Sequence, residues 1–489
     1  MKKQFVIYTA LVFVLFLVTS SCNKDFLEQL PETTRTTNTV YKTSGDFYNA
    51  VIGAYSTLKH NGLYGNGGAN AALLNLGETV SDNADFGATR AVSNVSTFEL
   101  EDFNFSLSNT FFSSAWTGHY IGIARTNTIL SRLPAASLDK ALSDRFEGEA
   151  KFLRGLFYFN LVRLFGDVQL VTTETNDPNE GYNILKSPAA KVYEQIISDL
   201  SAAETLLPAA ISNAEAGRAS RWAAKALLGK VYLTQKEYVK AATKLNEIIA
   251  SAQFNVTANT YAAVFSNLTA FSANKDIIFA VQYKSGNIGQ GSAIWSATIP
   301  WGGPATSFGV NGGSGEGFLR PTAEMINAYE PGDLRKAATV ATSYMIGNTT
   351  VNERYLVKYR QNGINQNEAD IDFPVLRYAD VLLMYAEALV EQGQVATAVP
   401  FVNQVRTRAG LAGLSTTLSQ ADARMAIENE RRFELAFEAH RWFDLIRTGR
   451  YLAVMTSKGY ATKEFHKFYP IPQRETDLNP SLAQNEGYK

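Results

Sequence analysis

The spacing of apolar residues along the chain predicts a mainly helical protein. Over 46–60 and again over 116–130, apolar side chains recur every three or four residues, which places them on one face of a helix. A third stretch, 149–165, has the same period, is rich in phenylalanine and ends at Gly166, where a helix would stop. These stretches predict three long helices, each with one buried face.

Helix pairs recur further along the sequence. The stretch 222–233 has the Leu-Gly-x-x-Tyr spacing of the first helix of a tetratricopeptide repeat, and 241–248 has the small and apolar positions of the second helix. The same pattern recurs more loosely over 386–405, and 149–165 with 193–206 forms a further pair. A small residue is needed where two helices cross closely. Generic amphipathic hairpins are the alternative, and both interpretations predict a scaffold without chemistry.

Between 252 and 370 the composition shifts toward Gly, Ser, Asn and Thr. Short β-like runs such as 277–283 are interspersed. We expect a loop-rich insertion carried by the helical scaffold, and loops held in this way are where binding usually occurs.

Charged and aromatic residues are unusually dense over 428–450. Glu430, Glu434 and Glu438 recur every four residues, and Gly449 is placed to end a single helix. The arginines that we expect to pair with these glutamates are Arg431, Arg432, Arg441 and Arg447. Such a cluster is either catalytic or a half-buried ion-pair network. Arginine does not release its proton at ordinary pH, so the pattern favours a network.

Composition excludes several classes of function. The chain has 489 residues, of which 46% are hydrophobic and 12% aromatic, enough for a well-buried core. A net charge of −1 argues against nucleic acid as the main partner, because binding phosphates requires a basic surface. With one cysteine and four histidines, an intrachain disulfide framework and a cysteine-rich zinc site are both excluded.

The first residues predict export and anchoring. A basic start and an apolar run over 5–18 are typical of a signal peptide, predicted here as 1–21. The chain's single cysteine, Cys22, lies at the cleavage point and indicates a lipoprotein, although Thr19 stands where such signals prefer leucine. The alternative is simple secretion with a free thiol. The polar stretch 22–43 reads as a tether, and no other stretch is long enough to span a bilayer.

Catalytic motifs are absent from the sequence. It contains no P-loop, no His-Glu-x-x-His and no Gly-x-Ser-x-Gly. Two acidic pairs, Asp82 with Asp85 and Asp370 with Asp372, have the residue types that glycoside hydrolysis needs. Turn acids or a structural calcium ion explain these pairs equally well. A surface glycan hydrolase is therefore the alternative function, and no cofactor is predicted.

Several motifs occur together in one order. They are the stretches 25–32, 149–166, 218–229, 376–388, 428–450 and 469–475. Together they make the chain resemble the SusD/RagB family of Bacteroidetes outer-membrane lipoproteins over nearly its full length. The resemblance implies a non-enzymatic, surface-exposed binding protein that forms a lid over a SusC-like TonB-dependent β-barrel transporter. Such a lid delivers oligosaccharides, or sometimes peptides, to the barrel. The implied fold is mainly α, with tetratricopeptide-type pairs as scaffold and a loop-rich, partly β insertion that carries the ligand.

The resemblance implies one SusD-like domain over 44–489. We expect it to consist of a helical part (44–251), the loop-rich insertion (252–370) and a C-terminal part with one more helix pair (371–489).

Binding residues have to be chosen on physical grounds. Sugars stack their C–H faces on aromatic rings, and amides, acids and guanidinium groups bind their hydroxyls. Candidates are aromatic residues in glycine-rich loops and polar residues near them. They are Tyr64, Phe86, Trp295, Trp301 and Phe308, with Asp82, Asn83 and Arg90 as polar partners. For each of them the alternative is a place in the core. We assign Trp116, Trp222 and Trp442, which lie on helical faces, to packing.

Overall fold

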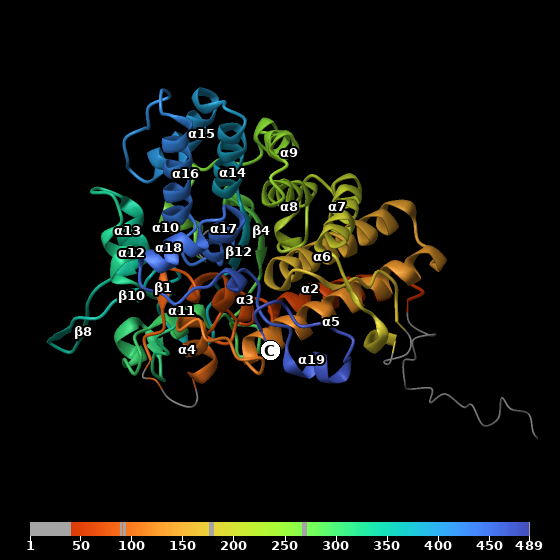
Figure 1. The fold of residues 1–489 in the computed structure, drawn as a ribbon, viewed down its shortest axis with the longest axis horizontal. Coiled ribbons are helices and arrows are strands. Elements are labelled where there is room, and N and C mark those ends of the chain that lie inside the picture. Colours follow the sequence, from red (N-terminus) through yellow and green to blue (C-terminus); the bar gives the residue numbers. More distant parts are fainter. Residues whose placement is uncertain (1–40, 89, 91–93, 176–179, 267–270, 489) are drawn as a thin grey trace, which may run out of the picture.

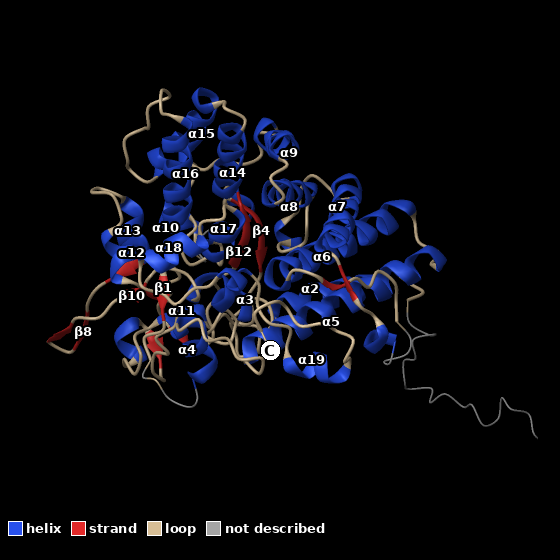
Figure 2. Ribbon diagram, in the orientation of Figure 1, coloured by secondary structure: helices blue, strands red, loops and turns tan. Residues whose placement is uncertain are grey.

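Long helices make up one side of the molecule, and a half rich in loops and short strands lies against them (Figure 1, Figure 2). The computed structural model describes residues 41–88, 90, 94–175, 180–266 and 271–488. The predicted signal peptide, Cys22 and nearly all of the tether lie outside these residues. None of the described helices is both long and apolar enough to cross a membrane. The predicted mainly helical class is confirmed.

The N-terminal stretches with a helical period form long helices. α2 (Ser44–Ser56) begins with a capping box, in which a threonine hydroxyl and an aspartate carboxylate each accept a backbone N–H. α5 (Thr110–Arg132) and α6 (Lys140–Phe165) follow. α6 ends at Gly166, whose φ of 71° lies in the left-handed region that favours glycine. The three predicted helices are therefore present.

Helix pairs of the predicted kind follow one another. They are α6 with α7 (Ala189–Leu206), α8 (Arg221–Thr234) with α9 (Tyr238–Ala250), and α14 (Tyr378–Glu391) with α15 (Val395–Arg408). A Cβ built on Gly155 would lie 2.9 Å from Leu200 of the partner helix. A Cβ built on Gly229 would lie 2.6 Å from Leu245. Side-chain carbons do not approach this closely, so packing requires the small residues that the pattern predicted.

The other helices are short, except α16. They are α3 (Ala72–Leu74), α4 (Val95–Glu101), α10 (Tyr261–Val264), α11 (Ile294–Thr298), α12 (Ala323–Asn327), α13 (Leu334–Thr339), α16 (Gln420–Glu434), α17 (Arg441–Arg447), α18 (Tyr451–Ser457) and α19 (Gln473–Leu478). Several of them lie within 252–370, so the insertion predicted as loops and strands also contains short helices.

The described strands pair two by two. β4 (Ile277–Val281) and β12 (Phe373–Arg377) are antiparallel and buried at every position, and β4 confirms the predicted β-like run. The remaining pairs are β1 (Ala84–Asp85) with β6 (Arg320–Pro321), β2 (Val168–Gln169) with β3 (Lys186–Ser187), β5 (Val310–Asn311) with β11 (Ile364–Asn365), β7 (Val340–Ala341) with β10 (Tyr355–Leu356), and β8 (Tyr344–Ile346) with β9 (Thr349–Val351). β5 and β11 are parallel, and the other pairs are antiparallel.

The prediction of a single helix running to Gly449 is wrong. The chain leaves the helix after α16, and six residues separate the end of α16 from the start of α17. In between, Phe437 and Ala439 adopt left-handed backbone conformations, with φ of 63° and 61°. The buried partners of this bend explain it: the Phe437 amide donates to the Glu78 carboxylate (2.8 Å), and the Tyr359 hydroxyl donates to the Phe437 carbonyl (2.9 Å). These bonds satisfy the backbone N–H and C=O of Phe437, which would be bonded within the helix if the helix continued.

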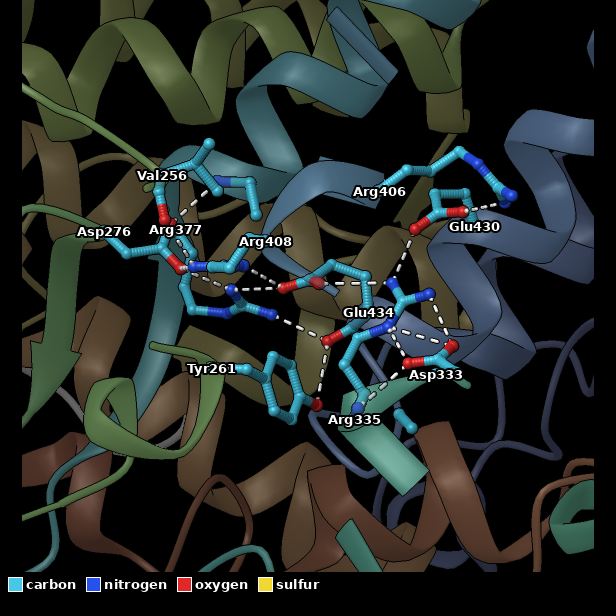
Figure 3. Close-up of polar contacts among 12 residues, drawn as sticks. Val256, Tyr261, Asp276, Asp333, Arg335, Arg377, Arg406, Arg408, Glu430 and Glu434 are labelled. Atoms are coloured by element: carbon cyan, nitrogen blue, oxygen red, sulfur yellow. Dashed lines mark hydrogen bonds and ion pairs between the residues drawn. The ribbon is translucent and has the colours of Figure 1, made fainter. Parts of the chain in front are cut away.

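A buried ion-pair network surrounds α16 and joins the two halves (Figure 3). Arg377 at the end of β12 donates to Glu434 (2.9 Å) and to Asp276 (2.7 Å). Arg335 of α13 donates to Glu430 (2.6 Å) and, at its own helix start, to Asp333 (2.8 Å). All six side chains are almost wholly buried. The predicted network is therefore present, but its glutamates pair with arginines from other segments of the chain.

The arginines within 428–450 have partners of their own. Arg431 donates to Asp380 on α14 (2.7 Å), and Arg441 donates to Asp82 (2.7 Å). Arg432 donates to Asn83 (2.8 Å), and Arg447 pairs with a glutamate of α14. The expectation that these arginines pair with Glu430, Glu434 and Glu438 is wrong. Helical spacing alone cannot show that each charge points to a different neighbouring element.

Candidate functional site

An exposed indole stands on the glycine-rich loop 299–317. Trp301 is 42% exposed. Backbone hydrogen bonds join the two arms of the loop that carries it. The Gly302 amide donates to the Gly315 carbonyl (3.1 Å), and the Gly317 amide donates to the Ile299 carbonyl (2.8 Å). These bonds fix the loop backbone, so Trp301 is exposed and also held in place.

Glycine is required where the two arms of this loop meet. A Cβ on Gly315 would lie 2.3 Å from the Pro300 carbonyl oxygen and 2.5 Å from the Ile299 side chain. No other residue fits so close to a backbone oxygen. The high glycine content of the stretch therefore reflects close backbone packing next to Trp301.

Aromatic rings support Trp301 from one side. The Phe86 ring meets the indole edge to face, with centroids 6.3 Å apart, and packs on Phe98 at 5.8 Å. The guanidinium of Arg90 lies over Phe98, 4.5 Å from its centroid, and pairs with Asp102 through two bonds of 2.6 and 2.8 Å. The result is an aromatic shelf, defined here as Trp301, Phe86 and Phe98, with an exposed ion pair at its rim.

A buried carboxyl lies behind the shelf. Glu101 accepts a hydrogen bond from the Phe86 amide and faces Asp85 and Arg320. Burial raises the pKa of Glu101 to about 7, and the Asp85 carboxylate adds to the rise. Phe86, which directly follows β1, is thus fixed by its backbone bond to Glu101.

A hairpin, β8 with β9, packs on the glycine-rich loop that carries Trp301. Tyr344, the first residue of β8, packs against Phe308 of the glycine-rich loop, with centroids 4.8 Å apart. At its tip Met345 and Ile346 are about half exposed (50% and 41%). The sequence reasoning missed this hairpin, although the alternation around Gly347 and its following asparagine is a recognised hairpin signal.

The other predicted aromatic ligands are not exposed. Trp295 is fully buried and donates its Nε1 hydrogen to the Phe308 carbonyl (3.3 Å). Phe308 itself is 2% exposed, and Tyr64 packs on Phe373 with centroids 5.4 Å apart. Phe86 is also buried and reaches the site only through its contact with Trp301. The expectation that these four rings lie exposed in loops is wrong, because the loops fold back into a packed layer that needs them as core.

Asp82 and Asn83 lie away from the shelf, in the ion-pair network. Although burial opposes its ionisation, the guanidinium of Arg441, with Arg432 and Lys458, holds the pKa of Asp82 well below its usual range. Asn83 donates to Glu78 and accepts from Arg432. Of the predicted polar partners, only Arg90 lies beside the shelf.

The two acidic pairs are engaged in local bonds. Asp85 pairs with Arg320 (2.5 Å), and Asp370 accepts from the amide and hydroxyl of Ser285 (2.7 and 2.8 Å). Burial raises the pKa of Asp372 to about 6. Across the described ranges, no group of three or more His, Cys, Asp or Glu side chains is placed to hold a metal ion.

Helix pairs that carry a loop-rich half, with Trp301 exposed on a backbone-bonded loop, are typical of a helical binding protein. Family models place it further: the SusD family matches 335–488, and a family described as starch-binding, associating with the outer membrane, matches 25–233. The chain belongs to the SusD/RagB family.

Relatives match over the whole chain. The SusD-like proteins P2 and P25 of Formosa agariphila are 29% and 27% identical, covering 100% of this chain and 100% and 99% of their own length. A solved structure of a laminarin-binding SusD-like protein superposes with a TM-score of 0.80 at 29% identity, covering 92% of this chain and 100% of that one.

Proposed function

We propose that this protein captures oligosaccharides at the cell surface without cleaving them and delivers them to a SusC-like TonB-dependent β-barrel transporter. The observation that carries the proposal is Trp301, a large ring that is exposed and yet held by a backbone-bonded loop. A sugar presents an apolar C–H face to such a ring, and a ring that is already fixed loses little entropy on binding.

The surroundings of the shelf suit a sugar. At the rim of the shelf, the Arg90–Asp102 pair carries donors and acceptors for hydroxyl groups, and the exposed Met345 and Ile346 of the β8–β9 hairpin are apolar. The laminarin-binding relative and the starch-binding description of one family model support glucans as the ligand class.

The proposal includes an anchor. Residues 1–21 would be removed as a signal peptide, Cys22 would carry lipid, and 22–43 would tether the domain to the outside of the outer membrane. The outer-membrane association in the description of the N-terminal family model supports this location.

Binding is tested with oligosaccharides from starch and laminarin by isothermal titration calorimetry. Trp301→Ala is expected to weaken binding about ten-fold, because an aromatic stacking contact contributes about 1–1.5 kcal/mol. Tyr48→Ala is the matched control: Tyr48 is 47% exposed, but it lies on α2 in the helical half. Equal affinity of the two variants would place the binding site elsewhere.

The hydrolase alternative is tested on the same glycans. We expect no release of shorter products over hours. Product release that Asp82→Asn or Asp372→Asn abolishes would overturn the proposal of a binding protein. Co-purification of a β-barrel transporter with the lipidated protein from outer membranes is the expected sign of the transport partner.

A further inference from the structure

A small cavity lies where the helical half meets the bend between α16 and α17. It has a volume of about 30 Å³, which is room for one water-sized group or one monatomic ion. Residues of α6, α8, β12 and the bend 438–440 line it. The three rings of the aromatic shelf are not among the lining residues, so this cavity is separate from the proposed sugar site.

The Asn160 side chain on α6 directs a donor toward this cavity. Asn160 is 1% exposed, and its side-chain oxygen accepts a hydrogen bond from the Arg163 guanidinium (2.6 Å). A guanidinium only donates, so this bond fixes which way the amide is turned. The Tyr64 hydroxyl lies beside Asn160, yet the amide nitrogen makes no hydrogen bond to any described residue. A buried donor of this kind needs an acceptor.

Arg163 adds a positive charge without a carboxylate of its own. Its guanidinium lies between the rings of Phe159 and Phe443, 4.1 Å from each centroid. It donates to two neutral oxygens, the Phe159 carbonyl (3.2 Å) and the Asn160 side chain, and within the described ranges it forms no ion pair. Burial lowers the pKa of Arg163 to about 10, so the group still carries its charge at pH 7.

The carboxylates that act on Arg163 from a distance are bonded to other cations. They are Asp380 and Asp444. Asp380 accepts from Lys230 (3.0 Å) and from Arg431 (2.7 Å). Asp444 accepts from Arg431 (3.0 Å) and from another arginine of α17 (2.8 Å). The charge of Arg163 is therefore not matched by a neighbouring side chain.

The other polar groups of the cavity wall are free donors or engaged acceptors. Lys230 uses one of its three hydrogens on His440 Nδ1 (2.9 Å) and one on a carboxylate, which leaves a third. Because His440 accepts at Nδ1, its ring hydrogen is on Nε2. Glu438 also lines the cavity, but its two oxygens accept from Lys358 (2.5 Å) and from Arg377 (2.7 Å).

This distribution of donors favours an anion over a water molecule. A water molecule needs acceptors for its own two hydrogens, whereas a monatomic anion only accepts and also supplies the charge that Arg163 lacks. The volume excludes polyatomic anions such as phosphate. Leu73, Leu156 and Leu227 complete the wall. An apolar wall favours a weakly hydrated halide, because a strongly hydrated ion such as fluoride loses more by leaving water.

We propose that this cavity is a chloride site, with the Asn160 amide, the Arg163 guanidinium and the Lys230 ammonium group as its donors. The ion would join α6 and α8 to the bend that carries His440, at the junction of the two halves. This inference does not depend on which ligand the aromatic shelf binds, and its tests contain no glycan.

Bromide tests the site directly in the unaltered protein, because it replaces chloride and scatters X-rays anomalously. Crystals soaked in sodium bromide are expected to show an anomalous peak at hydrogen-bonding distance from the Asn160 amide nitrogen and the Arg163 guanidinium. A map without a peak in this cavity would overturn the proposal.

Thermal unfolding gives a second readout in solution. Replacing about 200 mM sodium fluoride with sodium chloride at pH 7 is expected to raise the melting temperature by about 2 °C, for a dissociation constant of about 5 mM. Non-specific salt effects run the other way, since strongly hydrated anions favour the folded state more. Equal melting temperatures in the two salts, or a lower one in chloride, would overturn the proposal.

Asn160→Asp tests the assignment of the donors. The new carboxylate would pair with Arg163 and take the place of the ion, so we expect the same melting temperature in both salts. Asn127→Asp is the matched control. Asn127 is also 1% exposed and accepts from an arginine of α6, Arg154 (2.9 Å), but its amide nitrogen already donates to two carbonyls.

Asn127→Asp is expected to lower the melting temperature in both salts and to keep the difference of about 2 °C between them. A chloride response that persists in Asn160→Asp, or that disappears in both variants, would refute the assignment. If Asn160→Asp does not fold, the bromide map of the unaltered protein decides.

Discussion

Replacing Arg377 with methionine tests whether the buried network holds the two halves together. Arg377 is 2% exposed and donates to Asp276 at 2.7 Å and to Glu434 at 2.9 Å. A third ion pair, at 2.7 Å, joins it to Glu438. Methionine keeps much of the volume but leaves these carboxylates with one cation fewer. Breaking a buried pair in this way costs about 3–5 kcal/mol of folding free energy.

The assay is urea unfolding at pH 7, followed by tryptophan fluorescence and circular dichroism. In a chain of this size, a loss of 4 kcal/mol corresponds to a fall in melting temperature of only about 4 °C, so chemical unfolding is the more sensitive measure. Arg90→Met is the matched control, because it breaks an exposed pair with Asp102 and is expected to cost less than about 1 kcal/mol.

The cost of Arg377→Met should also shrink as the pH falls toward 4.5. The Arg377 guanidinium is one of the charges that lower the pKa of Glu434, so without it Glu434 takes up a proton more readily as the pH falls, which removes the uncompensated negative charge that the substitution creates. A loss below about 1 kcal/mol at pH 7, or a loss equal to that of Arg90→Met, would refute the view that this network stabilises the junction.

Two further substitutions probe single positions. Burial raises the pKa of Glu78 to about 7, above its unfolded value near 4.5, so its contribution to stability declines as the pH rises between these values. The stability of Glu78→Gln relative to the unaltered protein should therefore increase from pH 5 to pH 8, by up to about 3 kcal/mol in urea titrations. A stability difference that does not change with pH would contradict this. Gly229→Ala should lose about 1–3 kcal/mol, because its Cβ would lie 2.6 Å from Leu245. Gly53→Ala on α2, with nothing within 4 Å, should be neutral or stabilising, and equal effects of the two alanines would contradict the packing argument.

Local periodicity predicted the scaffold well. The helices around Gly155 and Gly229 follow from the 3.6-residue period, and the glycines mark close crossings that the structure contains. These helices can be predicted from the sequence because the residues that determine them lie within a few helical turns of one another. The same reasoning failed after Glu434, where the bend depends on Glu78, more than 350 residues away in the sequence.

The exposure of the candidate site residues was predicted only in part. Trp301 and Arg90 lie at the surface as expected, whereas Trp295 and Phe308 are core residues of the layer beneath. All four residues lie in or beside loop sequence. Composition cannot distinguish an aromatic ring that is exposed on the surface of a loop from one that is buried beneath it. That distinction depends on backbone bonds such as those between the two arms of 299–317, which no local pattern encodes.

Asp82 and Asn83 connect the network to the aromatic shelf. Arg441 and Arg432 hold them from the C-terminal segment, at 2.7 and 2.8 Å. Immediately after them, β1 pairs with β6, and the chain then reaches Phe86 under the indole. The strand that supports the shelf is therefore fixed at its start by buried charges. Asp82 and Asn83, which are candidate ligands for sugar hydroxyls, are thus bonded to arginines next to the segment that carries Phe86, the ring on which the exposed Trp301 packs.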